Sequence, residues 1–204
     1  MKAIGIVGSP RKGGNTEMLT SHALKALAEE GIEIELIPLA GLDIRGCTGC
    51  RACWEKETCS VKDDMWPIYE KMKQADGIII ASPVYFSSAT SLVKGLMERT
   101  GYVAQKSGQR FRGKVGGSLV VARRAGHNAT KAQLDYWFHI LEFVMPGAVY
   151  WNMAFGRDKG EVLNDQEGLD TAWNFAKNMA ELMKKLHGDF TPLVGKALPD
   201  GPTG

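Results

Sequence analysis

The sequence lacks long hydrophobic runs, a strong excess of either charge, and a leader-like start. No apolar stretch approaches the roughly 20 residues that cross a bilayer, and the chain enters a strand-like segment where a signal peptide would stand. The net charge is only +2, with basic and acidic residues interspersed, which argues against nucleic acid or a membrane surface as the partner. We therefore expect a cytoplasmic protein that binds neither.

Cysteine is also absent from most of the chain. All four cysteines lie at positions 47 to 59, and the other residues contain none. A disulfide framework would distribute its cysteines through a chain of this size, so the cluster indicates a metal or redox role.

The size of the chain suits one domain. With 204 residues, of which 44% are hydrophobic, it can bury a sizeable core. We assign the domain to residues 1–190, with a cysteine-rich insertion at 41–62, and assign 191–204 to a tail rich in proline and glycine. No repeat or linker divides the chain.

Apolar runs of strand length alternate with helix-patterned stretches. Buried parallel strands consist of such runs, and crossover helices join them. Five strands then predict an α/β three-layer sandwich, with a parallel sheet in 2-1-3-4-5 order and helices on both faces. The expected strands are 3–7, 32–39, 77–81, 115–122 and 148–153, and the expected helices are 16–30, a short one ending at 74, 92–99, 130–143 and 170–186.

The loop at residues 8–16 lies between the first strand and the first helix. Unpaired N–H groups and converging peptide dipoles at a helix start favour a bound phosphate. Glycines at 13 and 14 allow close approach of the backbone, and the side-chain donors are Ser9, Arg11, Asn15 and Thr16. Lys12 is followed by glycine rather than Ser or Thr, so the loop is not a Walker A motif. The alternative is a glycine-rich turn without a ligand.

Loops after the first, third and fourth strands meet at one edge of such a sheet, where ligands bind. Tyr85 and Phe86 can stack on a flat ring, and backbone N–H groups at 84–87 can bond its heteroatoms. The fourth-strand loop adds Arg123, Arg124 and Gly126, and either arginine near the ring would favour its reduced, anionic form. FMN meets these demands. The alternative is that the aromatic residues pack at the sheet end and the arginines are solvated.

The cysteines follow the spacing Cys-x2-Cys-x2-Cys-x5-Cys, at Cys47, Cys50, Cys53 and Cys59. This spacing lets one segment wrap a 4Fe–4S cluster, with three thiolates from a tight turn and the fourth from just beyond. Zinc sites usually take two pairs from separated segments. We rank the cluster first, reduced thiols without a metal second, and zinc third.

These motifs resemble a known family, the flavodoxin-like NADPH-dependent FMN reductase superfamily, in its iron-sulfur flavoprotein branch. Five motifs carry the resemblance: the loop at 8–16, the cysteine cluster, Lys-Asp-Asp-Met at 62–65, Ala-Asp-Gly at 75–77 and Ser-Pro-Val-Tyr-Phe at 82–86. The resemblance implies a homodimer or homotetramer. It implies that FMN is held at its phosphate by Ser9, Arg11, Asn15 and Thr16, and around its ring by Pro83, Val84, Tyr85 and Phe86.

The predicted function is that of an FMN-dependent oxidoreductase. It would pass electrons between a two-electron donor, NAD(P)H or similar, and one-electron carriers of the ferredoxin type through FMN and the cluster. No catalytic acid, base or nucleophile stands out, and flavin chemistry does not strictly require one. The alternatives are an FMN-dependent NAD(P)H:quinone or flavin reductase without a cluster, and a non-catalytic flavodoxin-like electron carrier. Such carriers usually present an acidic docking face. The net charge of this chain is close to zero and slightly positive, which weighs against a carrier of this kind.

Overall fold

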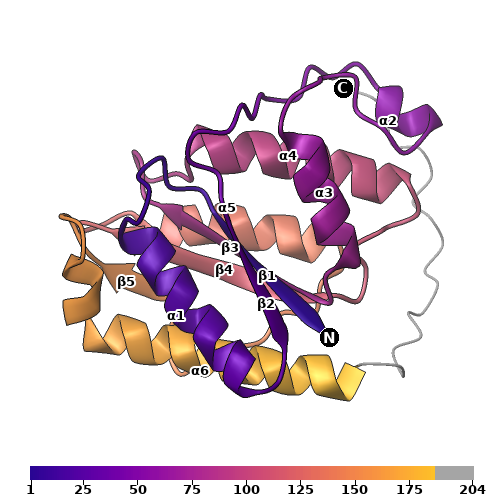
Figure 1. The fold of residues 1–204 in the computed structure, drawn as a ribbon. Coiled ribbons are helices and arrows are strands. Elements are labelled where there is room, and N and C mark those ends of the chain that lie inside the picture. The colour runs from indigo at the N-terminus through magenta and orange to yellow at the C-terminus, as the bar shows by residue number, and fades with distance from the viewer. Residues whose placement is uncertain (187–204) are drawn as a thin grey trace.

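The structure is a computed structural model that describes residues 1–186, so the predicted tail at 191–204 and the domain boundary at 190 lie outside the described residues. Strands and helices alternate along the chain (Figure 1). The elements are β1 (Lys2–Val7), α1 (Asn15–Glu29), β2 (Glu33–Pro38), α2 (Ala52–Glu55), α3 (Met65–Gln74), β3 (Gly77–Pro83), α4 (Ser91–Lys106), β4 (Val115–Ala122), α5 (His127–Ile140), β5 (Met153–Phe155), the 3-10 helix η1 (Glu161–Asn164) and α6 (Gln166–Leu186).

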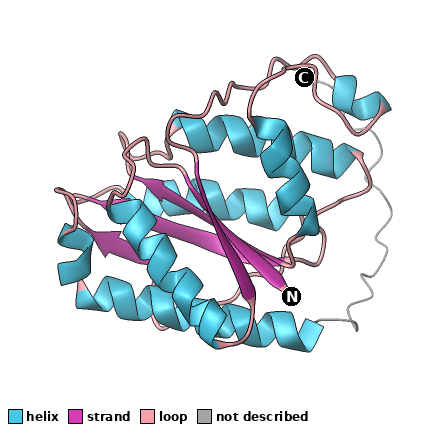
Figure 2. Ribbon diagram, in the orientation of Figure 1, coloured by secondary structure: helices cyan, strands magenta, loops and turns pink. Residues whose placement is uncertain are grey.

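The five strands form one parallel sheet in the order β2-β1-β3-β4-β5, which confirms the predicted topology (Figure 2). β1 is central to the pairing, with Ile6 opposite Ile37 of β2 and opposite Ile80 of β3. This order brings the carboxyl ends of β1, β3 and β4 together at one edge of the sheet.

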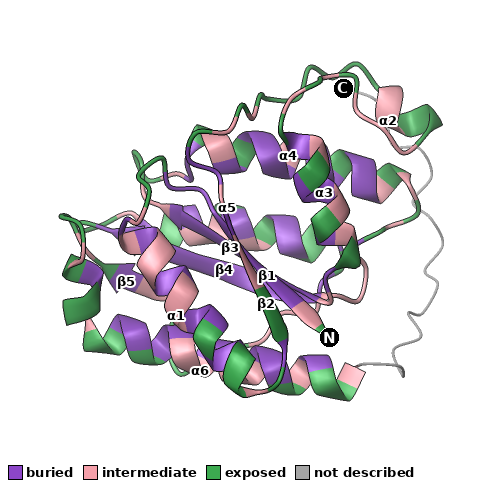
Figure 3. Ribbon diagram, in the orientation of Figure 1, coloured by how far each residue is buried: buried purple, intermediate pink, exposed green. Residues whose placement is uncertain are grey.

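Helices cover both faces of the sheet, with α3, α4 and α5 on one face and α1 and α6 on the other (Figure 1). Successive strand residues point to opposite faces: Ile4 and Ile78 pack in the first core, whereas Ala3 and Ile79 pack in the second. The central strands are buried almost throughout (Figure 3), which explains why their sequences are continuous apolar runs.

The loop after β1 is fixed against the start of α4. The Gly8 N–H donates to the Ala81 carbonyl at 2.7 Å, and the Thr90 hydroxyl donates to the Gly8 carbonyl at 2.7 Å. A Cβ at Gly8 would lie 2.6 Å from the Val93 side chain, so glycine is needed for this close approach. The glycine-rich loop therefore starts at a fixed point above the sheet.

The strand predicted at 148–153 is wrong in its position. β5 begins at Met153 and pairs only with the end of β4, where Met153 lies opposite Val120. Tyr150 and Trp151 made the earlier segment strand-like, but they are 55% and 54% exposed and lie outside the sheet. The loop after the fifth strand consequently begins further along the chain than predicted.

Three further segments differ from the prediction. α4 continues to Lys106 instead of ending at 99, and α2 and η1 form in segments where no regular structure was expected. The cysteines lie between β2 and α3, in the insertion predicted for them. Within residues 1–186, none of the helices has the length and apolar character to cross a membrane.

Candidate functional site

The loop at residues 8–16 leaves the start of α1 open. Gly14 is the N-cap residue and has no side chain that could accept from the first-turn N–H groups, so these donors are available to an anion. Gly13 turns the chain with a φ of +62°, and its own N–H donates to the Glu17 carboxylate at 2.7 Å. The Ser9 hydroxyl accepts from the Arg11 N–H at 3.1 Å. The loop is thus internally fixed while the helix start stays accessible.

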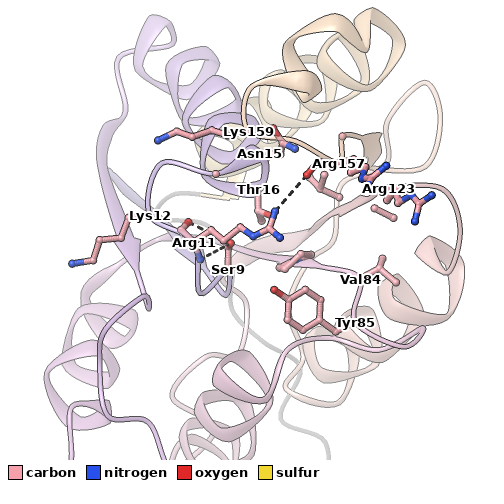
Figure 4. Close-up of a pocket in the computed structure, with 15 residues that line it drawn as sticks. Ser9, Arg11, Lys12, Asn15, Thr16, Val84, Tyr85, Arg123, Arg157 and Lys159 are labelled. Carbon is pink, nitrogen blue, oxygen red and sulfur yellow. Dashed lines mark hydrogen bonds between the residues drawn. The ribbon is translucent and has the colours of Figure 1, made fainter.

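This loop opens onto a cavity of about 320 Å³ at the carboxyl edge of the sheet (Figure 4). The volume is in the range of small-molecule sites, roughly 300 to 1,000 Å³. Eight of the ten predicted cofactor-binding residues line it: Ser9, Arg11, Asn15, Thr16, Pro83, Val84, Tyr85 and Arg123. Residues from three loops, far apart in sequence, therefore meet where the strand order predicts.

The other two predicted residues, Phe86 and Gly126, lie off the cavity lining. Phe86 is fully exposed. Gly126 is the N-cap residue of α5 and has a φ of +92°, and a Cβ there would lie 2.7 Å from the Val84 side chain. Gly126 therefore shapes the cavity by letting the start of α5 approach Val84.

The loop after β3 is a tight turn. Tyr85 and Ser88 exchange backbone hydrogen bonds of 2.9 and 3.0 Å, and Phe86 and Ser87 both have positive φ, as in a type I′ turn. The Val84 N–H donates to the Val121 carbonyl at 2.9 Å. The Val84 and Tyr85 N–H groups, expected to be available to a ligand ring, are thus bonded within the protein. What these two residues offer the cavity is their side chains.

A fourth loop, residues 156–160 after β5, closes the cavity and was not predicted. Asn15 holds it: its amide donates to the Asp158 carbonyl and its oxygen accepts from the Gly160 N–H, both at 2.8 Å. Arg11 reaches across to the carbonyl of Arg157 at 3.4 Å (Figure 4). Asn15 thus orders a neighbouring loop as well as lining the cavity, and its predicted contact with a phosphate stays a prediction. The signal for this loop was the carboxyl end of the fifth strand, which the sequence analysis placed too early.

The cavity is strongly cationic. Its charged lining residues are Arg11, Lys12, Arg123, Arg157 and Lys159, and no Asp or Glu of the described chain lines it. The Lys159 ammonium lies over the glycine-rich loop, 3.0 Å from the position of a Cβ at Gly13. A cavity with charges of one sign and an open helix start attracts a multiply charged anion such as a phosphate.

The four cysteines line a second, small cavity of about 20 Å³ between the insertion and α4. The Gly49 N–H donates to Cys47 Sγ at 3.4 Å, and Cys50 Sγ lies 2.8 Å from the Ser60 hydroxyl. Thiolates suit both iron–sulfur clusters and zinc. Within residues 1–186, no three His, Cys, Asp or Glu side chains gather closely enough for a single ion. Four thiols that line one cavity are the donor set of a cluster in which each iron takes one thiolate.

The thiols differ in their ionisation. Hydrogen bonds, first from Ser60 and then from the Ala52 N–H, lower the pKa of Cys50 to about 7. Burial raises the pKa of Cys53. Cys50 is therefore more readily a thiolate than Cys53, and thiolate is the form that binds iron or zinc.

Polar contacts anchor the cysteine segment, residues 45–63, to the body of the protein. The Glu57 carboxylate accepts from the Tyr69 hydroxyl at 2.9 Å and from Arg110 at 2.8 Å, and pairs with Lys73 at 2.9 Å. Tyr69 is fully buried, and burial together with Glu57 raises the pKa of its hydroxyl. The segment between Cys53 and Cys59 is thus held to α3 and to the loop after α4.

Comparisons with known proteins agree with this geometry. The family model described as NADPH-dependent FMN reductase matches residues 1–158. An iron-sulfur flavoprotein of Methanocaldococcus jannaschii is 42% identical over 191 residues, covering 90% of this chain and 98% of that protein. The crystal structure of RosB with bound 8-demethyl-8-formylriboflavin-5′-phosphate has a TM-score of 0.72 at 19% identity, covering 92% of this chain and 80% of that one. A flavodoxin from the domain Archaea has a TM-score of 0.61 at 14% identity, covering 90% and 99%.

Proposed function

Since the chain belongs to the NADPH-dependent FMN reductase family, in its iron-sulfur flavoprotein branch, and is an FMN-dependent oxidoreductase, we propose that it passes electrons between a two-electron donor such as NAD(P)H and one-electron carriers, using FMN and a 4Fe–4S cluster. The observation that carries this proposal is the presence of two separate cavities in one chain. One is cationic and lies at the carboxyl edge of the sheet, and the other is lined by four thiols.

The residues of the first cavity suit FMN. The open start of α1 and the Arg11 and Lys159 side chains would hold the phosphate, since helix N–H groups and fixed cations favour a dianion. Val84 and Tyr85 would face the ring, and Arg123 would favour its reduced, anionic form. FMN, when bound, supplies the conversion between two-electron and one-electron transfer. The chain then orients the cofactor and sets its electrostatic environment.

Cys47, Cys50, Cys53 and Cys59 would hold the cluster. They line one cavity, and a backbone N–H already points at the sulfur of Cys47, as is common around cluster ligands. The curated relative from M. jannaschii is named an iron-sulfur flavoprotein, which supports the same assignment.

The test is the cofactor content of protein purified without oxygen. We expect one FMN and about four irons with matching acid-labile sulfide per chain, together with flavin absorption that NAD(P)H bleaches. A Cys47→Ala, Cys50→Ala variant should lose the iron and keep the FMN. Flavin without iron would favour the cluster-free quinone or flavin reductase, and bleaching by reduced ferredoxin alone would remove NAD(P)H as the donor. Absence of both groups would refute the proposal.

We also propose that the chain is a homodimer or homotetramer. Apolar side chains are exposed in the segment before β5 and on α5: Val149, Tyr150, Trp151, Tyr136 and Ile140. Aromatic side chains are enriched at subunit interfaces, and exposed apolar side chains of this size are candidates for such contacts. The cytoplasmic location expected from the sequence stays a prediction.

A further inference from the structure

Arg99 is a buried cation that the proposed chemistry leaves unexplained. It lies in the middle of α4, and its side chain is only 1% exposed. An arginine is always protonated in proteins, and burying its charge is costly unless its donors are fully paired. The partners that compensate this cost therefore indicate what the residue is for.

Within residues 1–186, all the partners that the structure gives the Arg99 guanidinium come from the cysteine segment. Nη1 pairs with the Asp63 carboxylate at 2.5 Å and donates to the Arg45 carbonyl at 3.2 Å, and Nη2 donates to the Val61 carbonyl at 2.9 Å. The Nε and Nη2 groups donate to Cys59 Sγ at 3.3 and 3.4 Å. One side chain thus gathers both ends of the segment and contacts one of its sulfurs directly.

The surrounding face of α4 is shaped for the same segment. A Cβ at Gly95 would lie 3.1 Å from the Arg45 carbonyl, so the glycine permits a close approach of the two backbones. The Glu98 carboxylate accepts from the Cys47 N–H at 3.4 Å. Gly95, Glu98 and Arg99 follow one another within about a turn of helix. The segment therefore rests on a rigid element of the fold.

The orientation of the guanidinium matters for electrostatics. Its Nε and Nη2 edge faces the sulfur, while Nη1 faces the carboxylate. The cation contacts Cys59 directly, so the sulfur experiences mainly the positive member of the ion pair. In a buried site such an interaction is screened much less than in water.

We propose that Arg99 is a positioning residue that fixes Cys59 as the fourth ligand and, through its permanent charge, makes the cluster easier to reduce. Hydrogen bonds to ligand sulfurs and nearby positive charge are known determinants of cluster potentials. The inference rests on the proposed cluster. Asp63 has the supporting role of allowing the arginine to be buried, because it supplies the opposite charge.

The test compares Arg99→Gln and Arg99→Lys with the wild type and with Arg110→Gln as the matched control. Arg110 also pairs with a carboxylate of the cysteine segment, Glu57, but the structure gives it no contact with a sulfur. The readouts are iron and sulfide per chain, the rate of iron loss to a chelator, and the midpoint potential from a redox titration followed by electron paramagnetic resonance.

We expect Arg99→Gln to shift the reduction equilibrium about tenfold towards the oxidised cluster, which is 59 mV for a one-electron couple. Arg99→Lys keeps the charge and loses the planar fork, so we expect a potential near that of the wild type with several-fold faster iron loss. Arg110→Gln should match the wild type in both measurements. A merely structural role would accelerate iron loss in both Arg99 variants without separating their potentials.

Arg99→Gln leaves the buried Asp63 carboxylate with only the longer ion pair to Arg45, at 3.8 Å, and is the variant most at risk of misfolding. A double variant, Arg99→Gln with Asp63→Asn, removes both buried charges. We expect its potential to stay below that of the wild type, because the cation contacts the sulfur and is lost. If Arg99→Gln and the double variant both had the wild-type midpoint potential, the role of Arg99 would be refuted and the proposed cluster would stand. Wild-type protein without iron would refute the proposed cluster, and this inference with it.

Discussion

A single hydroxyl, that of Thr90, joins α4 to the loop after β1, and Thr90→Val tests its importance. Thr90 is 4% exposed; its Oγ1 donates to the Gly8 carbonyl at 2.7 Å and accepts from the Val93 N–H at 3.4 Å as the N-cap of α4. Loss of a cap with so long a bond costs about 0.5 kcal/mol. A buried carbonyl deprived of its donor costs about 1 to 3 kcal/mol. We expect Thr90→Val to lower the free energy of unfolding by roughly 1.5 to 3.5 kcal/mol.

Thr100→Val is the matched control because it makes the same change in the same helix. Thr100 is also fully buried, but its hydroxyl donates to the Leu96 carbonyl at 2.7 Å, which the helix already pairs with a backbone N–H. We expect a cost below about 1 kcal/mol. Urea unfolding followed by far-ultraviolet circular dichroism, with all proteins in the same flavin and iron state, measures both. Equal costs for the two variants would refute the argument that Thr90 ties α4 to the loop.

Three further predictions concern the flavin cavity, acid stability and assembly. Asn15→Ala removes two hydrogen bonds to the loop at 156–160. We expect a flavin fluorescence titration to show FMN binding roughly tenfold more weakly, a loss of about 1.4 kcal/mol in the free energy of binding. An unchanged affinity would show that this loop does not contribute to FMN binding. Burial opposes ionisation of Asp63, but hydrogen bonds from Arg99 and from the Arg45 and Met65 N–H groups hold its pKa below its ordinary value. A carboxyl group whose pKa is lower in the folded state stabilises the fold at pH values above its unfolded pKa of about 3.9, and this stabilisation is lost as the pH falls through its folded pKa. The free energy of unfolding in acid should therefore depend less on pH in Asp63→Asn than in the wild type. The same pH dependence in both proteins would contradict this. Trp151→Arg places a charge on the exposed aromatic segment, and we expect light scattering to show a smaller assembly than the wild type; a monomeric wild type would contradict the proposed oligomer.

The sheet could be predicted because each buried strand is marked by a short apolar run in the sequence itself. The strands at 3–7 and 77–81 are buried on both faces, so each is a continuous apolar run bounded by polar residues. The fifth strand could not be placed in this way. Tyr150 and Trp151 have the residue types of a strand, but their exposure depends on what else packs against the sheet, which no local pattern contains.

The meeting of the loops at the cavity could be predicted for those loops that directly follow a correctly placed strand. Ser9, Val84 and Arg123 come at or after strand ends, so the sheet order alone brings them together. The loop at 156–160 contacts Asn15 across more than 140 positions of sequence, and this contact depended on the strand that was misplaced. Arg99 gives no signal at all, because an arginine in a helix is ordinarily solvated.

The two cavities share α4 as a common support. At its start, the Thr90 hydroxyl holds the Gly8 carbonyl of the loop that borders the cationic cavity, and further along, Arg99 holds Cys59. Nine residues separate the two positions, or roughly 14 Å along the helix axis. Thr90 and Arg99 are both buried, so a shift of α4 would disturb hydrogen bonds at both cavities together. Leu42, Ile44, Cys53 and Cys59 of the insertion pack against the core, and polar anchors hold the rest of this largely exposed segment. This is the situation in which metal binding and local order reinforce each other. Removal of the proposed cluster should therefore loosen residues 45–63 first. The loop after β1, which the Ala81 carbonyl holds from the side of the sheet, should stay in place.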